Sequence, residues 1–217
     1  MIEGAKDNAP PPNQVAGQKH WTGRGAFIDD GGFASYKRYL QTISEAALKA
    51  EVTGTCEERI DLDPALERLR TEFRVASADN GRLIFIGNGG SASIASHLAV
   101  DFTKNAGIPA TAFNDVAMLT CLANDYSYEE VFARQLAFYA TRRDVVVIIS
   151  SSGRSPNVLK SAAAARNIGC RMLVTLSGMD PNNLLRTLGD LNFYVPCRDY
   201  GLVEIAHLAL LHSVVSL

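Results

Sequence analysis

The sequence predicts an α/β fold in which a parallel β-sheet is covered by helices on both faces. Short, uninterrupted apolar runs alternate with helical patterns along most of the chain, and two Gly/Ser-rich loops each follow such a run. Strands that are apolar on both faces are typical of a parallel sheet buried between helices. Ligands of such sheets bind beyond the carboxyl ends of the strands, where both loops are expected.

The composition is that of a globular protein. The chain has 217 residues, of which 47% are hydrophobic and 20% charged, and its net charge is −2. This charge gives no general basic field for nucleic acid or an anionic membrane, and no apolar run approaches the roughly 20 residues of a membrane span. The four cysteines form no CxxC pair. We therefore expect a cytoplasmic protein with reduced thiols, no nucleic-acid partner and no membrane partner.

The first part of the chain differs in composition from the rest. Residues 1–31 are rich in Pro, Gly and polar residues, which predicts a flexible N-terminal tail, and residues 32–217 are expected to form a single domain that includes N-terminal helices. Apolar residues at helical spacing predict an amphipathic helix over 33–50. A second helix is expected to begin with Asp63 as N-cap and Pro64 at its first position, and to end at Asn80-Gly81.

The remaining elements alternate in type. Strands are expected at 83–86, 110–113, 145–149, 172–176 and 192–195. Helices are expected from the first loop to about 104, and at 118–123, 129–139, 156–167 and 201–215. This alternation continues to the carboxyl end and shows no internal repeat.

The two loops carry residues suited to an anion. Gly87-Asn88-Gly89-Gly90-Ser91 leaves an apolar strand and opens a helix, and Ser150-Ser151-Ser152-Gly153-Arg154-Ser155 does the same further along. Glycine lets the backbone approach a phosphate, the helix N-terminus offers free N–H groups, and serine adds neutral donors. Each loop taken alone is also explained as a turn. The pair of them favours a phosphate site, and the absence of GK[ST] and GxGxxG spacing disfavours a nucleotide.

Ionisable residues occur on two helices that are otherwise apolar. His97 and Asp101 are four residues apart and share a face, and on the last helix Glu204 and His212 are separated by about 80° around the axis. From the residues alone, a surface ion pair is the favoured explanation of His97 and Asp101 over a functional site. Ionisable groups on mostly buried helices usually have a partner or a function.

The loops and the last helix, together with Asn124-Asp125, resemble the sugar isomerase (SIS) fold and, within it, the phosphoheptose isomerases. The resemblance covers roughly 33–217 and implies a flavodoxin-like parallel sheet and homotetramers with active sites between subunits. It also implies a set of substrate-binding residues. These are Asn88, Gly89, Gly90, Ser91, Asp125, Ser150, Ser151, Ser152, Ser155 and Glu204.

The same resemblance implies the chemistry. Asp101 and His212 would be the catalytic pair, and one zinc ion per site would be held by His97, Asp101, Glu204 and His212. The chain departs from the family pattern at three places: Asp101 replaces Glu, Glu204 replaces Gln, and Gly201-Leu202 replaces an Asp-Arg pair.

The implied reaction is aldose–ketose isomerisation of sedoheptulose 7-phosphate to D-glycero-heptose 7-phosphate through an enediol, with metal assistance. Two alternatives remain open. One is a non-catalytic SIS protein that senses a sugar phosphate or binds a partner, although the presence of Asp101 and His212 argues against it. The other is an isomerase of a different sugar phosphate, which the Gly201-Leu202 change favours. The apolar stripe of the 33–50 helix predicts a homo-oligomer.

Overall fold

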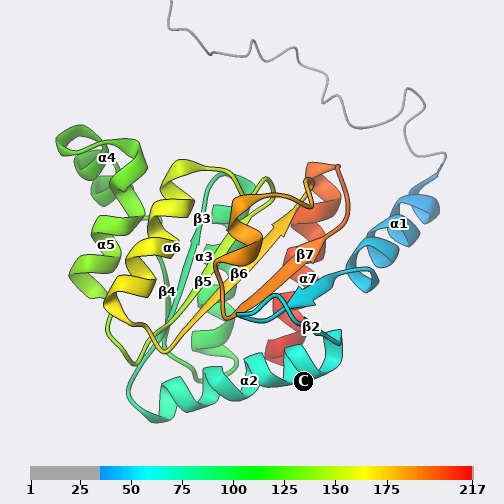
Figure 1. The fold of residues 1–217 in the computed structure, drawn as a ribbon, viewed down its shortest axis with the longest axis horizontal. Helices are drawn as coiled ribbons and strands as arrows, with labels where there is room; N and C mark the ends of the chain where they lie inside the picture. The colour runs from blue at the N-terminus through cyan, green and yellow to red at the C-terminus, as the bar shows by residue number, and fades with distance from the viewer. Residues whose placement is uncertain (1–34, 217) are drawn as a thin grey trace, which may run out of the picture.

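A computed structural model describes residues 35–216, and the predicted tail at 1–31 lies outside the described residues. Its centre is a seven-stranded sheet with the strand order β2-β1-β7-β6-β5-β3-β4 (Figure 1). The strands are β1 Glu51–Thr53, β2 Arg59–Ile60, β3 Leu83–Gly87, β4 Ala110–Ala112, β5 Val145–Ser150, β6 Met172–Gly178 and β7 Leu191–Val195. The five strands predicted from apolar runs are confirmed.

The sheet is mostly, and not wholly, parallel. The pairs β4–β3, β3–β5, β5–β6 and β6–β7 are parallel. In contrast, β1 pairs antiparallel with both β2 and β7. The sequence analysis missed β1 and β2, because the segments Glu-Val-Thr and Arg-Ile contain no apolar run and precede the alternation of strands and helices. The prediction of a parallel sheet is therefore corrected at this one edge.

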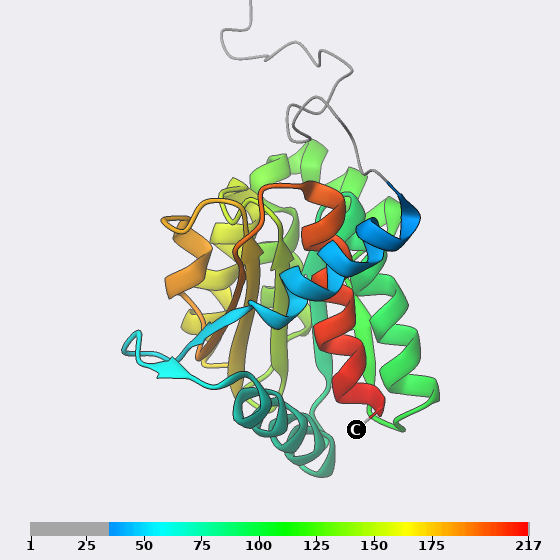
Figure 2. The ribbon, with the colours of Figure 1, turned by 90° about the vertical axis from the view of Figure 1, so that its right-hand side faces the viewer.

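Helices cover both faces of the sheet. They are α1 Tyr36–Leu48, α2 Leu62–Ala78, α3 Gly90–Lys104, α4 Val116–Asp125, α5 Val131–Tyr139, α6 Pro156–Ile168 and α7 Tyr200–Ser216. On one face, α2, α3 and α7 pack against the sheet, and on the other α4, α5 and α6 do so (Figures 1 and 2). Alternate residues of β5 enter the two cores: Val145, Val147 and Ile149 one, Val146 and Ile148 the other. Period-two alternation in a strand that is apolar throughout fills both cores at once.

The starts of α1 and α2 are explained by their N-cap residues. The Ser35 side chain accepts from the Arg38 N–H and caps α1, which crosses over α7 in Figure 2. The predicted start of α2 is wrong by two residues, because Asp61 has the extended backbone of an N-cap and Leu62 is already helical. Pro64 still lies in the first turn, where a missing N–H costs no helical hydrogen bond. Asn80, after α2, has the predicted left-handed backbone, with φ of 58°.

The sheet has a topological switch point between β3 and β5. From β3 the chain crosses to β4 on one side, and from β5 it continues to β6 and β7 on the other. Loops that leave the carboxyl ends of two such neighbouring strands diverge and leave a crevice between them. Both predicted phosphate loops leave the sheet at this point.

None of the helices within 35–216 has the length and apolar character needed to cross a lipid bilayer.

Candidate active site

The two Gly/Ser loops line one cavity of about 260 Å³ at the switch point. Its walls are Asn88, Gly89, Gly90, Ser91, Ser150, Ser151, Ser152, Ser155, Tyr200 and Glu204. Helix α3 begins in the first of these loops, and α6 begins directly after the second. Because the lining includes no Lys or Arg, an anion bound here would be held by backbone N–H groups, helix dipoles and hydroxyls.

The first loop requires glycine for two different reasons. Gly89 has φ of 55° and ψ of −124°, a backbone conformation that side-chain-bearing residues rarely adopt. Gly90 has a close neighbour, since a Cβ there would lie 2.3 Å from Oε2 of Glu204. The last helix therefore approaches the loop closely enough to place a carboxylate directly over its backbone.

The second loop presents serine hydroxyls in different states. Ser150 Oγ accepts from the Gly153 N–H at 3.2 Å, and Ser152 Oγ lies 3.4 Å from the Arg154 nitrogen. Ser155 is the N-cap of α6, but its side chain makes no capping hydrogen bond. Ser151 Oγ is buried and has no hydrogen-bond partner within the described part of the chain. A buried hydroxyl without a partner in a polar cavity is suited to a ligand that supplies the missing acceptor.

Glu204 lies in this cavity, and partial burial raises the pKa of its carboxyl group. Tyr200, one turn earlier on α7, also lines the cavity and was not predicted as a site residue. An aromatic residue at a helix start carries no sequence signal of its own, and only the approach of α7 to the first loop identifies it.

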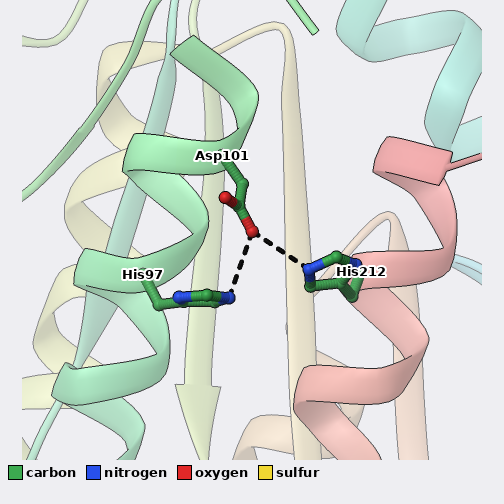
Figure 3. A group of neighbouring side chains, drawn as sticks. All are labelled: His97, Asp101 and His212. Atoms are coloured by element: carbon green, nitrogen blue, oxygen red, sulfur yellow. Dashed lines mark ion pairs between the residues drawn. The ribbon is translucent and has the colours of Figure 1, made fainter. Parts of the chain in front are cut away.

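A second group of polar residues joins α3 to α7. Asp101 Oδ2 lies 3.1 Å from Nε2 of His97 and 3.0 Å from Nε2 of His212, as the dashed lines of Figure 3 show. The two imidazole rings stack with their centroids 5.7 Å apart. The predicted pairing of His97 with Asp101 is therefore extended across the helix interface by His212.

These three side chains fit a metal ion of the zinc type. Their ligand atoms all lie within 4.8 Å of one another, and Asp101 Oδ2 is a buried oxygen whose near neighbours are the two imidazole nitrogens. Two imidazole nitrogens and a carboxylate oxygen are ligands that zinc prefers. Glu204 does not join them. Eight residues of helix separate it from His212 by about 12 Å along the axis, and it lines the cavity between the two Gly/Ser loops.

Asp125, a predicted substrate-binding residue, and Arg154 of the second loop lie outside the cavity lining. Asp125 is exposed at the end of α4, where Cys121 Sγ and the Asn124 amide contact its carboxylate. Arg154 forms an ion pair with Asp180. The loop after α4 nevertheless reaches the site, because the Tyr128 hydroxyl donates to Asn88 Oδ1 at 3.1 Å.

Comparisons with known proteins show which proteins this chain resembles. The model of the SIS domain family matches residues 50–177. A phosphoheptose isomerase from Helicobacter pylori (strain HPAG1) is 39% identical over 140 residues, which cover 62% of this chain and 72% of that protein. A phosphoheptose isomerase from Geobacter sp. (strain M21) is 33% identical over 180 residues, covering 78% of this chain and 93% of that protein.

A solved structure extends the likeness to the fold. The phosphoheptose isomerase GmhA of Neisseria gonorrhoeae superposes with a TM-score of 0.70 at 26% identity, over 83% of this chain and 93% of that one. The sequence resemblance stated above is thereby confirmed, and so is the α/β fold that it implied.

Proposed function

We propose that this chain, which belongs to the SIS domain family and within it to the phosphoheptose isomerases, converts sedoheptulose 7-phosphate to D-glycero-heptose 7-phosphate. One observation carries the proposal: α3 and α7, which carry the His97/Asp101/His212 cluster, also line the phosphate cavity. His97 lies six residues beyond Ser91 on α3, about 9 Å along the axis. A seven-carbon sugar phosphate is long enough to have its phosphate in the loops and its carbonyl end near the cluster.

The phosphate supplies binding energy away from the reacting carbons. The N–H groups of α3 and α6 and the Ser91, Ser151 and Ser155 hydroxyls hold it. Such remote binding orients C1 and C2 for proton transfer.

Asp101 and His212 transfer the proton. With a ketose substrate, the base removes a proton from C1, an enediol forms between C1 and C2, and the acid returns a proton to C2. A hydroxyl proton passes from O1 to O2, so the aldose has the same atoms as the ketose. The side chains of Asp101 and His212 approach to 3.0 Å, which suits two groups that serve adjacent carbons. With a metal ion bound at the same cluster, each would carry the proton on an atom that does not hold the metal.

We also propose that a zinc ion is held by His97, Asp101 and His212. Bound there, it would polarise the carbonyl group and stabilise the negative charge of the enediolate. Glu204, the fourth predicted ligand, would reach this zinc ion only after a rearrangement of α7. Otherwise a second subunit would supply the fourth ligand.

A homotetramer with sites between subunits is part of the same proposal. Val100, which lies between His97 and Asp101 in the sequence, is 60% exposed, and Ile205 beside Glu204 is 37% exposed. Apolar side chains exposed next to functional residues favour cover by a second copy of the chain. A cytoplasmic location is supported by the four free cysteines.

Turnover of sedoheptulose 7-phosphate by the purified protein tests the proposed function. We expect conversion to an aldose, loss of activity on chelation, and restoration by zinc. Asp101→Asn and His212→Ala should each lower kcat by about 10²-fold or more while the phosphate still binds. The matched control Asp79→Asn, which removes an exposed charge beside Arg171, should leave activity unchanged.

The two other readings give different results. Protection against heat by sedoheptulose 7-phosphate without turnover would point to a sensor. If the protein converts a different sugar phosphate and not sedoheptulose 7-phosphate, the proposed substrate is wrong and the isomerase activity stands. Full activity in both Asp101→Asn and His212→Ala would remove the catalytic assignment.

A further inference from the structure

The amide of Asn88 is held by a reciprocal pair of hydrogen bonds to Asn157. Asn88 Nδ2 donates to Asn157 Oδ1 at 2.9 Å, and Asn157 Nδ2 donates to Asn88 Oδ1 at 3.0 Å. Asn157 is the second residue of α6 and is only 2% exposed, so its amide is inside the molecule. This pair connects the first phosphate loop directly to the helix that follows the second loop.

The orientation of the Asn157 amide is fixed by a backbone group. The Val158 N–H donates to Asn157 Oδ1 at 2.9 Å, and a backbone N–H can only donate. The atom of the Asn157 amide next to the Val158 N–H must therefore be the oxygen, which also accepts from Asn88 Nδ2, and the nitrogen is left to donate to Asn88 Oδ1. Rotating the amide by 180° would place two donors against each other at a buried site.

The direction of these bonds determines what Asn88 offers to the cavity. Asn88 Oδ1 accepts from Asn157 Nδ2 and from the Tyr128 hydroxyl, so both of its lone pairs are used. Asn88 Nδ2 has two hydrogens, of which Asn157 takes one. The hydrogen that remains makes Asn88 a donor toward the cavity that it lines.

We propose that Asn157, assisted by Tyr128, is a positioning residue that fixes Asn88 as a hydrogen-bond donor to an oxygen of the bound sugar phosphate. The proposal rests on the proposed function for the ligand class. Without this support, the Asn88 amide is free to turn its oxygen toward the phosphate, where the two negative ends repel each other. The pair also holds the two loops at one separation, so that donors from both meet the same anion.

A double-mutant cycle tests whether Asn157 acts through Asn88. Binding of inorganic phosphate and of sedoheptulose 7-phosphate is measured by calorimetry for wild type, Asn88→Ala, Asn157→Ala and the double variant. We expect Asn157→Ala to weaken binding about tenfold and Tyr128→Phe about three- to tenfold. In the Asn88→Ala background, each should add less than about twofold, because the group that they orient is gone.

Kinetics separate positioning from a general loss of structure. We expect KM to rise in Asn157→Ala and Tyr128→Phe with kcat changed by less than about threefold. Exposed residues of the same type serve as controls, and Asn182→Ala and Tyr126→Phe should leave both constants unchanged. If Asn157→Ala does not fold, the Tyr128→Phe cycle still decides, because it removes one oxygen from an exposed side chain.

Each outcome has a definite meaning. Additive losses in the double variants, or wild-type affinity in both single variants, would overturn the proposal. Non-additive losses of phosphate affinity without turnover of the heptose would support the positioning role and remove the proposed reaction. A wild-type protein that binds neither probe would overturn both.

Discussion

The Ser151 hydroxyl is a group whose role in binding and role in stability can be separated. It is buried in the wall of the cavity and has no hydrogen-bond partner among the residues that the structure describes. In the free protein it pays for desolvation without a hydrogen bond, which is an unfavourable state for a hydroxyl. In a phosphate complex the same group would become a donor to a charged oxygen.

Ser151→Ala should therefore weaken phosphate binding without destabilising the protein. Loss of a hydrogen bond to a charged group costs about 1.5–3 kcal/mol, or roughly ten- to a hundredfold in affinity, while the free energy of unfolding should stay within about 0.5 kcal/mol. Calorimetry with inorganic phosphate and urea unfolding measure the two effects. The control is Ser161→Ala, since Ser161 bonds to the Val158 carbonyl inside α6 and should affect stability alone. Unchanged phosphate affinity in Ser151→Ala would show that the hydroxyl does not contact the anion.

Local sequence predicted only the residues of the site that stand in the two loops or on periodic helices. Gly89, Gly90 and the serines follow apolar strands, and this context is visible in the chain. Tyr128 and Asn157 reach Asn88 from 40 and 69 residues away, and no local pattern encodes such contacts. Glu204 lies at the cavity because α7 packs closely on the first loop. The periodicity of residues within α7 gives no information about this packing.

Among the strands, a place in the alternation of strands and helices mattered as much as length, since β4 was predicted although it has three residues, like β1. Strands of five or more buried residues, such as β3 and β5, were found from their apolar runs. The short edge strands β1 and β2 exist because β7 offers them an unpaired edge, and so they depend on tertiary structure. The start of α2 depended in the same way on the backbone of Asp61 and not on the Asp63-Pro64 signal.

Helix α7 is fixed to the sheet by a histidine that must remain neutral. His207 is fully buried, and its Nε2 lies 3.0 Å from the carbonyl oxygen of Ser177, at the end of β6. Its Nδ1 has no partner in the described chain, so a proton added there would be buried without an acceptor. Burial lowers the pKa of His207 from 6.5 to about 4, against the smaller opposing effect of the Ser177 carbonyl.

Acidification should consequently destabilise the protein through His207. The folded state binds fewer protons here than the unfolded state, so this contribution is fully present above pH 6.5 and is lost as the pH falls through about 4. Between about pH 7.5 and about pH 5 the wild type should lose roughly 2 kcal/mol that a non-titrating variant does not lose. His207→Gln can retain a donor to Ser177, and it provides the comparison.

Urea unfolding of both proteins at the two pH values measures this difference. Because carboxylates titrate equally in the two proteins, the wild-type advantage at neutral pH should shrink in acid. An advantage that is the same at both pH values would mean that His207 is not held neutral by the fold.

At the level of the assembly, α1 and α3 each expose large apolar side chains among polar ones. Tyr36 and Leu48 on α1 are each 75% exposed, and Val100 is exposed on α3 beside the His97/Asp101/His212 cluster. Both helices pack against α7, and symmetric oligomers commonly cover exposed apolar side chains of this kind. The predicted homo-oligomer would thus join its subunits close to the chemistry.

Val100→Glu should break assembly and activity together. A charge buried between subunits without a partner is strongly unfavourable, whereas the same charge on an isolated subunit is exposed to water. Sedimentation equilibrium should show a smaller species for Val100→Glu than for wild type, with turnover reduced at least about tenfold and monomer folding retained by circular dichroism. Leu184→Glu is the control, because Leu184 is similarly exposed but belongs to the opposite face of the sheet, next to Leu185 of the second core. If wild type sediments as a monomer with full activity, the predicted homo-oligomer is wrong, and the cluster and the two loops of one chain are enough for catalysis. If Val100→Glu stays assembled and active, the subunits meet elsewhere, and the exposure of Val100 requires another explanation.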